Sequence, residues 1–129
     1  MIKNRPLGHI GLGTNNIEAT VNWYINVLGF KLIGDFFSPV GEPIKFVQSG
    51  DIIYEIFQPL GGVAAPGKID HFSFSSEDIE ADYQYCVEQG YTFEAEGIQE
   101  LPTVWEKGAR YFKIMSPSGE AVEFCQILK

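Results

Sequence analysis

Hydrophobic residues in the first quarter of the chain recur three or four positions apart, which is typical of one apolar face of a helix. Asn15 precedes this stretch and Gly29 follows it. We expect Asn15 to cap the helix, with Glu18 three residues on completing a capping box, and Gly29 to end it. The apolar stripe consists of Ile17, Val21, Tyr24, Ile25 and Leu28.

The same pattern returns in the second half of the chain. Ser76 is placed to cap a second helix, Glu77 and Asp78 fall in its electropositive first turn, and Gly90 follows its last apolar residue. The apolar stripe of this helix consists of Ile79, Tyr83, Cys86 and Val87. The chain therefore contains two predicted helices with similar boundaries.

Strands are predicted before and after each helix. Period-two alternation and turn residues favour one strand before each helix and three after it. The segment 99–108 is predicted as a loop, and 116–119 as a turn. The predicted strands are residues 7–13, 30–38, 43–49 and 51–58, then 68–75, 91–98, 109–116 and 120–127.

The two halves are repeats of one pattern. His9-Ile10 corresponds to His71-Phe72, and at the same offset Ile17-Glu18-Ala19 corresponds to Ile79-Glu80-Ala81. The order of elements is βαβββ twice, an α+β class in which two modules share a core. We therefore expect a single domain over 1–129, with module 1 at 1–60, a linker rich in Gly, Pro and Ala at 59–67, and module 2 at 68–129.

Composition narrows the possible partners. The chain has 129 residues, is 45% hydrophobic and carries a formal net charge of −8, so we expect binding neither to nucleic acid nor to an anionic membrane surface. The N-terminus has no apolar signal-peptide core, and no apolar run is long enough to span a bilayer. With two cysteines and no C-x-x-C motif, we expect reduced thiols and a cytoplasmic protein.

Candidate chemistry lies at equivalent positions of the two repeats. The only two histidines, His9 and His71, fall on the first strand of each half, and Glu55 and Glu123 fall on apolar faces of the last strands. A buried carboxylate needs a partner, and two imidazoles with two carboxylates are a suitable ligand set for a divalent metal. The alternative is a pair of satisfied core histidines with both glutamates turned outward.

Five motifs occur in order along the chain: H-I-G-L at 9–12, N-W-Y-x-x-V-L-G-F at 22–30, I-Y-E-I at 53–56, D-H-F-S-F at 70–74 and P-S-G-E-A-V-E-F at 117–124. With these motifs the chain resembles the vicinal oxygen chelate superfamily. That group includes glyoxalase I, methylmalonyl-CoA epimerase, extradiol dioxygenases and the fosfomycin and bleomycin resistance proteins. The resemblance covers nearly the whole chain and implies a glyoxalase-like fold with a cupped mixed sheet.

The ligand set looks most like that of bacterial glyoxalase I, a lactoylglutathione lyase. The resemblance implies one divalent metal per site (nickel, zinc, cobalt or manganese) held by His9, Glu55, His71 and Glu123. It also implies proton abstraction next to a metal-bound carbonyl through an enediolate, with Glu123 as base and Glu55 as its counterpart. A homodimer is implied as well, with the site formed either within one chain or across two.

Two departures from the glyoxalase I pattern concern the substrate. Gly13 and Pro59 stand where that enzyme has an arginine and an asparagine that hold glutathione. Lys107, Arg110 and Lys113 form the densest basic group of the chain and can meet a carboxylate or phosphate of a small-molecule substrate. Solvated surface charges are the equal alternative.

Two further functions stay open. A methylmalonyl-CoA epimerase-like enzyme would act on a thioester in place of a hemithioacetal and would need a second acid or base, for which Glu42 is the candidate. A non-catalytic, drug-binding protein would line its pocket with aromatic side chains, although each of these is more typical of a core. The aromatic candidates are Phe36, Phe37, Phe46, Tyr54, Trp105 and Tyr111.

Overall fold

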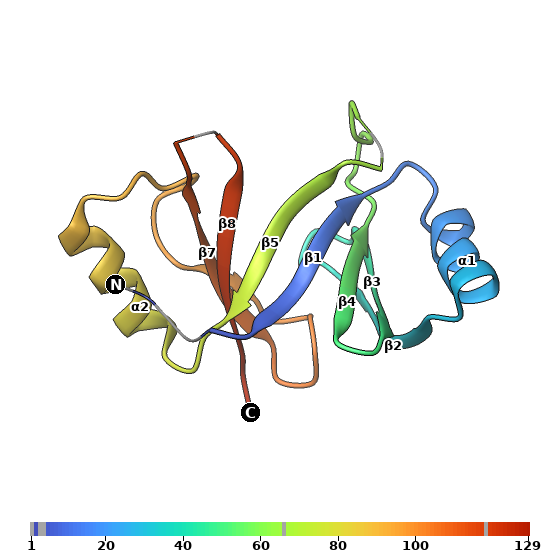
Figure 1. Cartoon of the computed structure of the whole chain (residues 1–129), viewed down its shortest axis with the longest axis horizontal. Coiled ribbons are helices and arrows are strands. Elements are labelled where there is room, and N and C mark those ends of the chain that lie inside the picture. Colours follow the sequence, from blue (N-terminus) through green and yellow to red (C-terminus); the bar gives the residue numbers. More distant parts are fainter. Residues whose placement is uncertain (1, 3–4, 66, 118) are drawn as a thin grey trace. The chain divides into compact units, whose positions relative to one another are not determined.

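The computed structural model describes residues 2, 5–65, 67–117 and 119–129, and it has two helices and eight strands (Figure 1). Each half contains one strand, one helix and three strands, so the predicted α+β fold of two βαβββ modules is confirmed. The elements are β1 (Leu7–Gly13), α1 (Ile17–Leu28), β2 (Lys31–Phe37), β3 (Pro43–Ser49), β4 (Ile52–Phe57), β5 (Ile69–Ser75), α2 (Ile79–Gln89), β6 (Gln99–Leu101), β7 (Ala109–Met115) and β8 (Ala121–Ile127).

The chain divides into two compact units. The N-terminal unit is His9–Asp70, and the C-terminal unit is His71–Lys129 together with Met1–Gly8. Within the N-terminal unit the strand order is β2-β3-β4-β1, and within the C-terminal unit it is β5-β8-β7-β6. In each unit the strand that carries the histidine runs parallel to the strand that carries the glutamate, and the remaining pairs are antiparallel.

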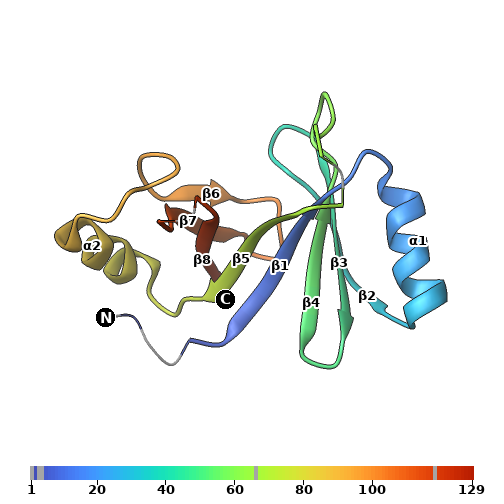
Figure 2. The same cartoon turned by 45° about the horizontal axis from the view of Figure 1, so that its top comes forward.

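The N-terminal unit buries the predicted apolar stripe of its helix. Helix α1 lies along one face of the sheet formed by β2, β3 and β4 (Figure 2). Tyr24, Phe30 and Tyr54 form an aromatic group at this contact, with ring centroids 5.1 to 5.9 Å apart. The buried core consists of Leu12, Ile17, Val21, Phe30, Val47 and Ile56.

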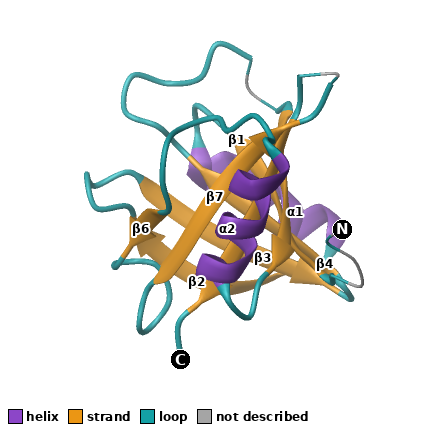
Figure 3. Ribbon diagram, turned by 90° about the vertical axis from the view of Figure 1, so that its left-hand side faces the viewer, coloured by secondary structure: helices purple, strands orange, loops and turns teal. Residues whose placement is uncertain are grey.

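The C-terminal unit is built in the same way, with α2 packed against β7 (Figure 3). Phe112 of β7 is 1% exposed and stacks on Phe124 of β8 at 5.3 Å. The buried core consists of Ile79, Cys86, Phe112 and Phe124. Neither described helix has the length and hydrophobicity that a membrane span requires.

The residues that cap the N-termini of the two helices differ from those predicted. Asn16, not Asn15, caps α1 by accepting a hydrogen bond from the Ala19 amide at 3.1 Å. Asn15 instead bonds the backbone of Val63, with 2.7 Å between Val63 N and Asn15 Oδ1. Asn15 and Asn16 are adjacent and either could cap the helix. Asn15 contacts Val63, and Asn16 is the residue that caps.

The N-terminal cap of the second helix also differs from the prediction. Its cap is Asp78, which accepts from the Ala81 amide at 3.1 Å. Ser76 lies before the helix and accepts from the Asp78 amide at 3.2 Å. Both predicted helix ends are confirmed, since Gly29 and Gly90 adopt the left-handed conformation at φ 73°.

The predicted strand at 91–98 is wrong. In that segment Phe93 alone makes a bridge, to Ile114, and β6 lies instead at Gln99–Leu101, inside the predicted loop 99–108. Gly97 turns the backbone at φ 84°, and its amide donates to the Tyr83 hydroxyl at 3.0 Å. The turn ends the alternating pattern that had predicted a strand. Ser118 of the predicted turn at 116–119 and Pro66 of the predicted linker lie outside the described residues.

A short N-terminal arm binds α2. The Arg5 guanidinium donates to both carboxylate oxygens of Asp82, at 2.7 and 2.5 Å, and the Ser76 hydroxyl donates to the same carboxylate at 2.6 Å. The Ser75 amide donates to the carbonyl of Pro6 at 3.0 Å. The arm is thus held by one buried carboxylate and by backbone bonding.

Candidate metal centre

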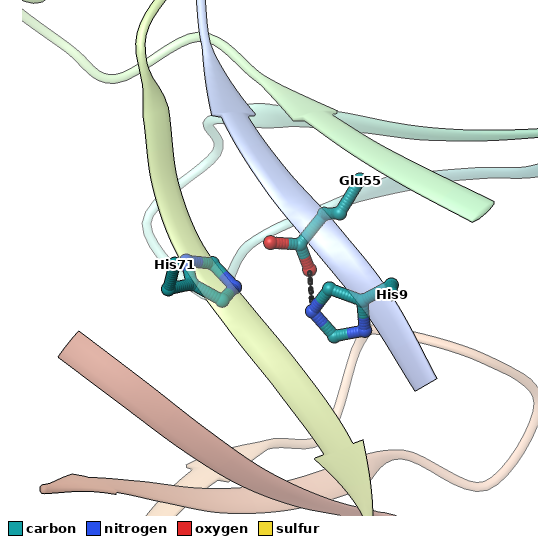
Figure 4. A group of neighbouring side chains, drawn as sticks. All are labelled: His9, Glu55 and His71. Carbon is teal, nitrogen blue, oxygen red and sulfur yellow. Dashed lines mark ion pairs between the residues drawn. The ribbon is translucent and has the colours of Figure 1, made fainter. Parts of the chain in front are cut away.

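In the N-terminal unit, His9 and Glu55 form a pair. Strand β1 supplies His9, and β4 supplies Glu55 in parallel register with Gly11. His9 and Gly11 share a face of β1, and Glu55 is paired with Gly11. The Glu55 side chain therefore lies on the same face of the sheet as the His9 imidazole. The distance from His9 Nε2 to Glu55 Oε2 is 3.8 Å, and the two side chains are 10% and 12% exposed (Figure 4). The His9 ring meets Phe46 edge-on at 5.7 Å.

In the C-terminal unit, His71 and Glu123 form the corresponding pair. Glu123 of β8 is in parallel register with Ser73 of β5, two residues beyond His71. His71 Nε2 lies 3.5 Å from Glu123 Oε1, and these side chains are only 3% and 6% exposed. Phe124, the next residue of β8, packs into the α2 core, so alternation places Glu123 on the opposite face.

The two pairs are geometrically equivalent. In each unit the glutamate is in register with the residue two positions beyond the histidine, Gly11 in one and Ser73 in the other. The structure therefore brings together His9 with Glu55 and His71 with Glu123, and it turns neither glutamate outward, since Glu123 is buried and Glu55 is half-buried. The repeat found in the sequence is also a repeat of side-chain geometry.

The donor atoms fit a divalent metal. His9, Glu55 and His71 each have an atom that could hold a metal ion (Figure 4). With metal–ligand bonds of about 2.1 Å, two neighbouring ligands stand about 3.0 Å apart at a right angle and about 3.4 Å apart at the tetrahedral angle. The observed separations, 3.8 and 3.5 Å, exceed normal hydrogen-bond lengths and approach the spacing of two ligands on one ion. Imidazole nitrogen and carboxylate oxygen suit a borderline ion such as zinc, nickel, cobalt or manganese.

The three predicted substrate-binding cations are not gathered together. Arg110 and Lys113 stand on opposite faces of β7, because they are three positions apart along the strand. Arg110 hydrogen-bonds Glu100 at 2.9 Å and Glu80 of α2 at 3.2 Å, and these carboxylates raise the pKa of its guanidinium. Lys107 is exposed in the loop before β7.

Of these three cations, Lys113 lies on the face of Glu123. The two residues are antiparallel register partners on β7 and β8. The Lys113 side chain is 14% exposed, its ammonium is 3.8 Å from Glu94 Oε1, and it lies 5.7 Å from the centre of the Tyr111 ring. It is therefore the one of the three whose position on the strand adjoins Glu123.

The structure also places the residues that depart from the glyoxalase I pattern. A side chain added at Gly13 would bring its Cβ to 3.0 Å from Val63 Cγ1 and 3.6 Å from the ring of Phe57. A side chain at this position would therefore require the Val63 side chain to shift slightly. The carboxylate of Glu42, the candidate second acid, accepts from the Leu60 amide at 2.9 Å and from the Ser38 hydroxyl at 3.4 Å.

Of the six aromatic candidates for a drug-binding pocket, Trp105 and Tyr111 belong to the C-terminal unit, and the other four are dispersed within the N-terminal unit. Phe46 and Phe36 contact one another at 6.2 Å on the side of His9, whereas Tyr54 packs in the α1 core and Phe37 is 59% exposed. They do not form one group.

Ser73 is a further polar residue at this pair that the sequence analysis did not single out. Its side chain is completely buried on the face of His71 and Glu123. A polar residue two positions after His71, where the first repeat has Gly11, was the available signal.

Comparisons with known proteins agree with this architecture. The family model described as Glyoxalase/Bleomycin resistance protein/Dioxygenase superfamily matches residues 6–124. An uncharacterized protein of Bacillus subtilis (strain 168), YwbC, is 31% identical over 128 residues, which cover 95% of this chain and 98% of YwbC.

Solved structures show the same fold. The hypothetical protein BH1468 from Bacillus halodurans C-125 has a TM-score of 0.79 and 25% identity, with 98% of this chain and 97% of that chain covered. Methylmalonyl-CoA epimerase from Mycobacterium tuberculosis has a TM-score of 0.80 at 18% identity, with 100% of this chain and 94% of that chain covered.

Proposed function

The chain belongs to the Glyoxalase/Bleomycin resistance protein/Dioxygenase superfamily, and from this premise we propose that it is a divalent-metal-dependent enzyme that moves a proton on the carbon next to a carbonyl. The observation that carries this proposal is the equivalent placement of two His/Glu pairs in the two repeats. A protein that only sequesters a ligand has no evident need for both pairs.

The proposed ligands of one metal ion are His9, Glu55, His71 and Glu123. The donor set supports nickel, zinc, cobalt or manganese. When bound, the metal would act as a Lewis acid that polarises the substrate carbonyl. Whether one chain or two contribute the four ligands is part of this proposal, and we expect a homodimer from the family resemblance.

The protein's own residues then carry the proton. We assign Glu123 as the base, because its side chain is less exposed than that of Glu55, 6% against 12%, and is better shielded from bulk water. Glu55 is the counterpart carboxylate that returns a proton. Lys113, on the face of Glu123, is the proposed contact for an anionic group of the substrate.

The substrate is a hemithioacetal or a thioester. A glyoxalase I-type lyase would hold glutathione through an arginine at position 13, yet this chain has Gly13 there, and a side chain at that position would have to displace the side chain of Val63. A lyase of this type would therefore have to bind its thiol differently. The missing arginine favours the second candidate, a methylmalonyl-CoA epimerase-like enzyme, in which one glutamate would remove the proton and a second acid, for which Glu42 is the candidate, would return a proton to the opposite face of the carbon. We place this reaction in the cytoplasm, where two cysteines without a C-x-x-C motif would stay reduced.

The test combines metal analysis with proton exchange. Protein purified without a metal-affinity tag is compared with His71→Ala, Glu123→Gln and the exposed control Glu88→Gln. We expect close to one divalent ion per site in the wild type and the control, and its loss in the other two variants.

The loaded enzyme is then given deuterated water with either the methylglyoxal–glutathione hemithioacetal or methylmalonyl-CoA. Deuterium incorporated into one substrate assigns the substrate class, and its absence with both His71→Ala and Glu123→Gln ties the exchange to the metal centre. Wild-type protein that neither contains a divalent ion nor takes one up would overturn the proposal and leave the ligand-binding alternative.

A further inference from the structure

Ser73 is an anomaly in the C-terminal unit. Its side chain is 0% exposed, and among the described residues no hydrogen-bond partner is found for its hydroxyl oxygen. A buried hydroxyl without a partner is costly, and native proteins almost always satisfy such groups. A residue that only filled space here would more suitably be alanine.

The surroundings of Ser73 indicate which group its hydroxyl serves. Ser73 follows His71 by two residues on the same face of β5, and Glu123 is its register partner on the neighbouring parallel strand. Directly paired side chains on one face have Cβ atoms about 5 Å apart, so a rotation of the Glu123 carboxylate brings one of its oxygens within reach of the hydroxyl.

The first repeat lacks this feature. Gly11 stands where Ser73 would be and is the register partner of Glu55. The two repeats therefore offer the same His/Glu pair, but at this register position the C-terminal unit has a hydroxyl and the N-terminal unit has a glycine.

We propose that Ser73 is a positioning residue for Glu123: its hydroxyl donates a hydrogen bond to one carboxylate oxygen while the other oxygen faces the metal. This inference rests on the metal centre proposed above. Carboxylates that bind metals are commonly oriented by such a second hydrogen bond, and its loss typically weakens metal binding 10- to 100-fold. The arrangement makes the two glutamates unequal, because Ser73 is the register partner of Glu123 and Gly11 that of Glu55.

We expect Ser73→Ala to leave the stability of the metal-free protein unchanged or higher, and to weaken metal binding. Without metal, the variant loses a buried hydroxyl that has no partner, so its melting temperature should equal or exceed that of the wild type. With metal, the variant loses the hydrogen bond that orients Glu123, so its affinity for zinc should fall. A serine that matters only for packing would not divide the effects in this way.

The experiment measures zinc affinity by competition with a chromophoric chelator, and the melting temperature of the metal-free protein. The matched control is Ser75→Ala, which removes a hydroxyl from the same face of β5, two residues further on. Cobalt(II) absorption provides a second readout, because the visible bands report the ligand geometry. We expect about 10- to 100-fold weaker zinc binding and an altered cobalt spectrum for Ser73→Ala, and wild-type values for Ser75→Ala.

Zinc affinity within twofold of the wild type in Ser73→Ala, with an unchanged cobalt spectrum, would overturn the inference and leave the metal centre intact. A lower melting temperature of the metal-free Ser73→Ala protein would also overturn it, since the hydroxyl would then already have a stabilising role. Failure of the wild type to bind zinc or cobalt would overturn the proposed function itself.

Discussion

Asp82→Asn should destabilise the C-terminal unit, because this carboxylate holds the N-terminal arm on α2. The change keeps the shape of the side chain, and the Ser76 hydroxyl can still donate to the amide oxygen. It removes the negative charge and replaces one acceptor of the Arg5 guanidinium with an N–H group. Two donors would then face one another.

The magnitude follows from burial. The Asp82 side chain is 9% exposed, but that of Arg5 is 28% exposed. Removing one partner of a fully buried ion pair costs about 3–5 kcal/mol, and an exposed pair contributes at most about 1 kcal/mol. Since Arg5 can recover part of its hydration, we expect a loss of about 2 kcal/mol in the free energy of unfolding.

Urea unfolding followed by circular dichroism measures this loss, and hydrogen exchange assigns it to a unit. We expect faster exchange in α2 of Asp82→Asn and unchanged exchange in α1. Glu88→Gln, an exposed change on the same helix, is the matched control and should alter stability by less than about 0.5 kcal/mol. A loss below about 0.5 kcal/mol for Asp82→Asn would refute the reasoning that the buried carboxylate holds the arm.

Three further predictions concern packing, backbone conformation and a thiol. Phe112→Ala empties the centre of the α2 core, where the side chain is 1% exposed, and should cost about 3–5 kcal/mol in urea unfolding; a loss below about 1 kcal/mol would mean that the core collapses onto the vacancy. Gly29→Ala and Gly90→Ala meet no neighbouring atom but keep a left-handed backbone, so each should cost about 1–2 kcal/mol from conformation alone, measured as a lowered unfolding midpoint; an unchanged midpoint would contradict the cap assignment. Burial, and then the charge of Asp82, raise the pKa of the Cys86 thiol. The unfolded chain therefore loses this proton first as the pH rises through the ordinary thiol range, and stability should fall there. Cys86→Ala should flatten that part of the pH profile, and an identical slope would be the contrary result.

The parts of the molecule that follow from local spacing could be predicted from the sequence. The period of two places Glu123 and Phe124 on opposite faces of one strand, and the repeat places Glu55 at the equivalent position. The same period places Arg110 and Lys113 on opposite faces, so the sequence already argues against a single basic group formed by both residues.

The parts that depend on distant contacts could not be predicted. Asn15 bonds the Val63 backbone in place of capping α1. The Tyr83 hydroxyl accepts from the amide of Gly97, where the segment 91–98 turns. Arg5 and Asp82 are 77 residues apart, and no local pattern connects them. Such contacts form only when the fold brings the partners together.

The N-terminal arm gives the molecule a built-in order of assembly. Because 77 residues separate Arg5 from Asp82, a ribosome that adds about 5–20 residues per second makes the partner about 4–15 s after the arm itself. The whole His9–Asp70 unit is synthesised during that interval. Arg5 is therefore synthesised before the unit that it completes, and it can bind its partner only after the chain has been made as far as Asp82.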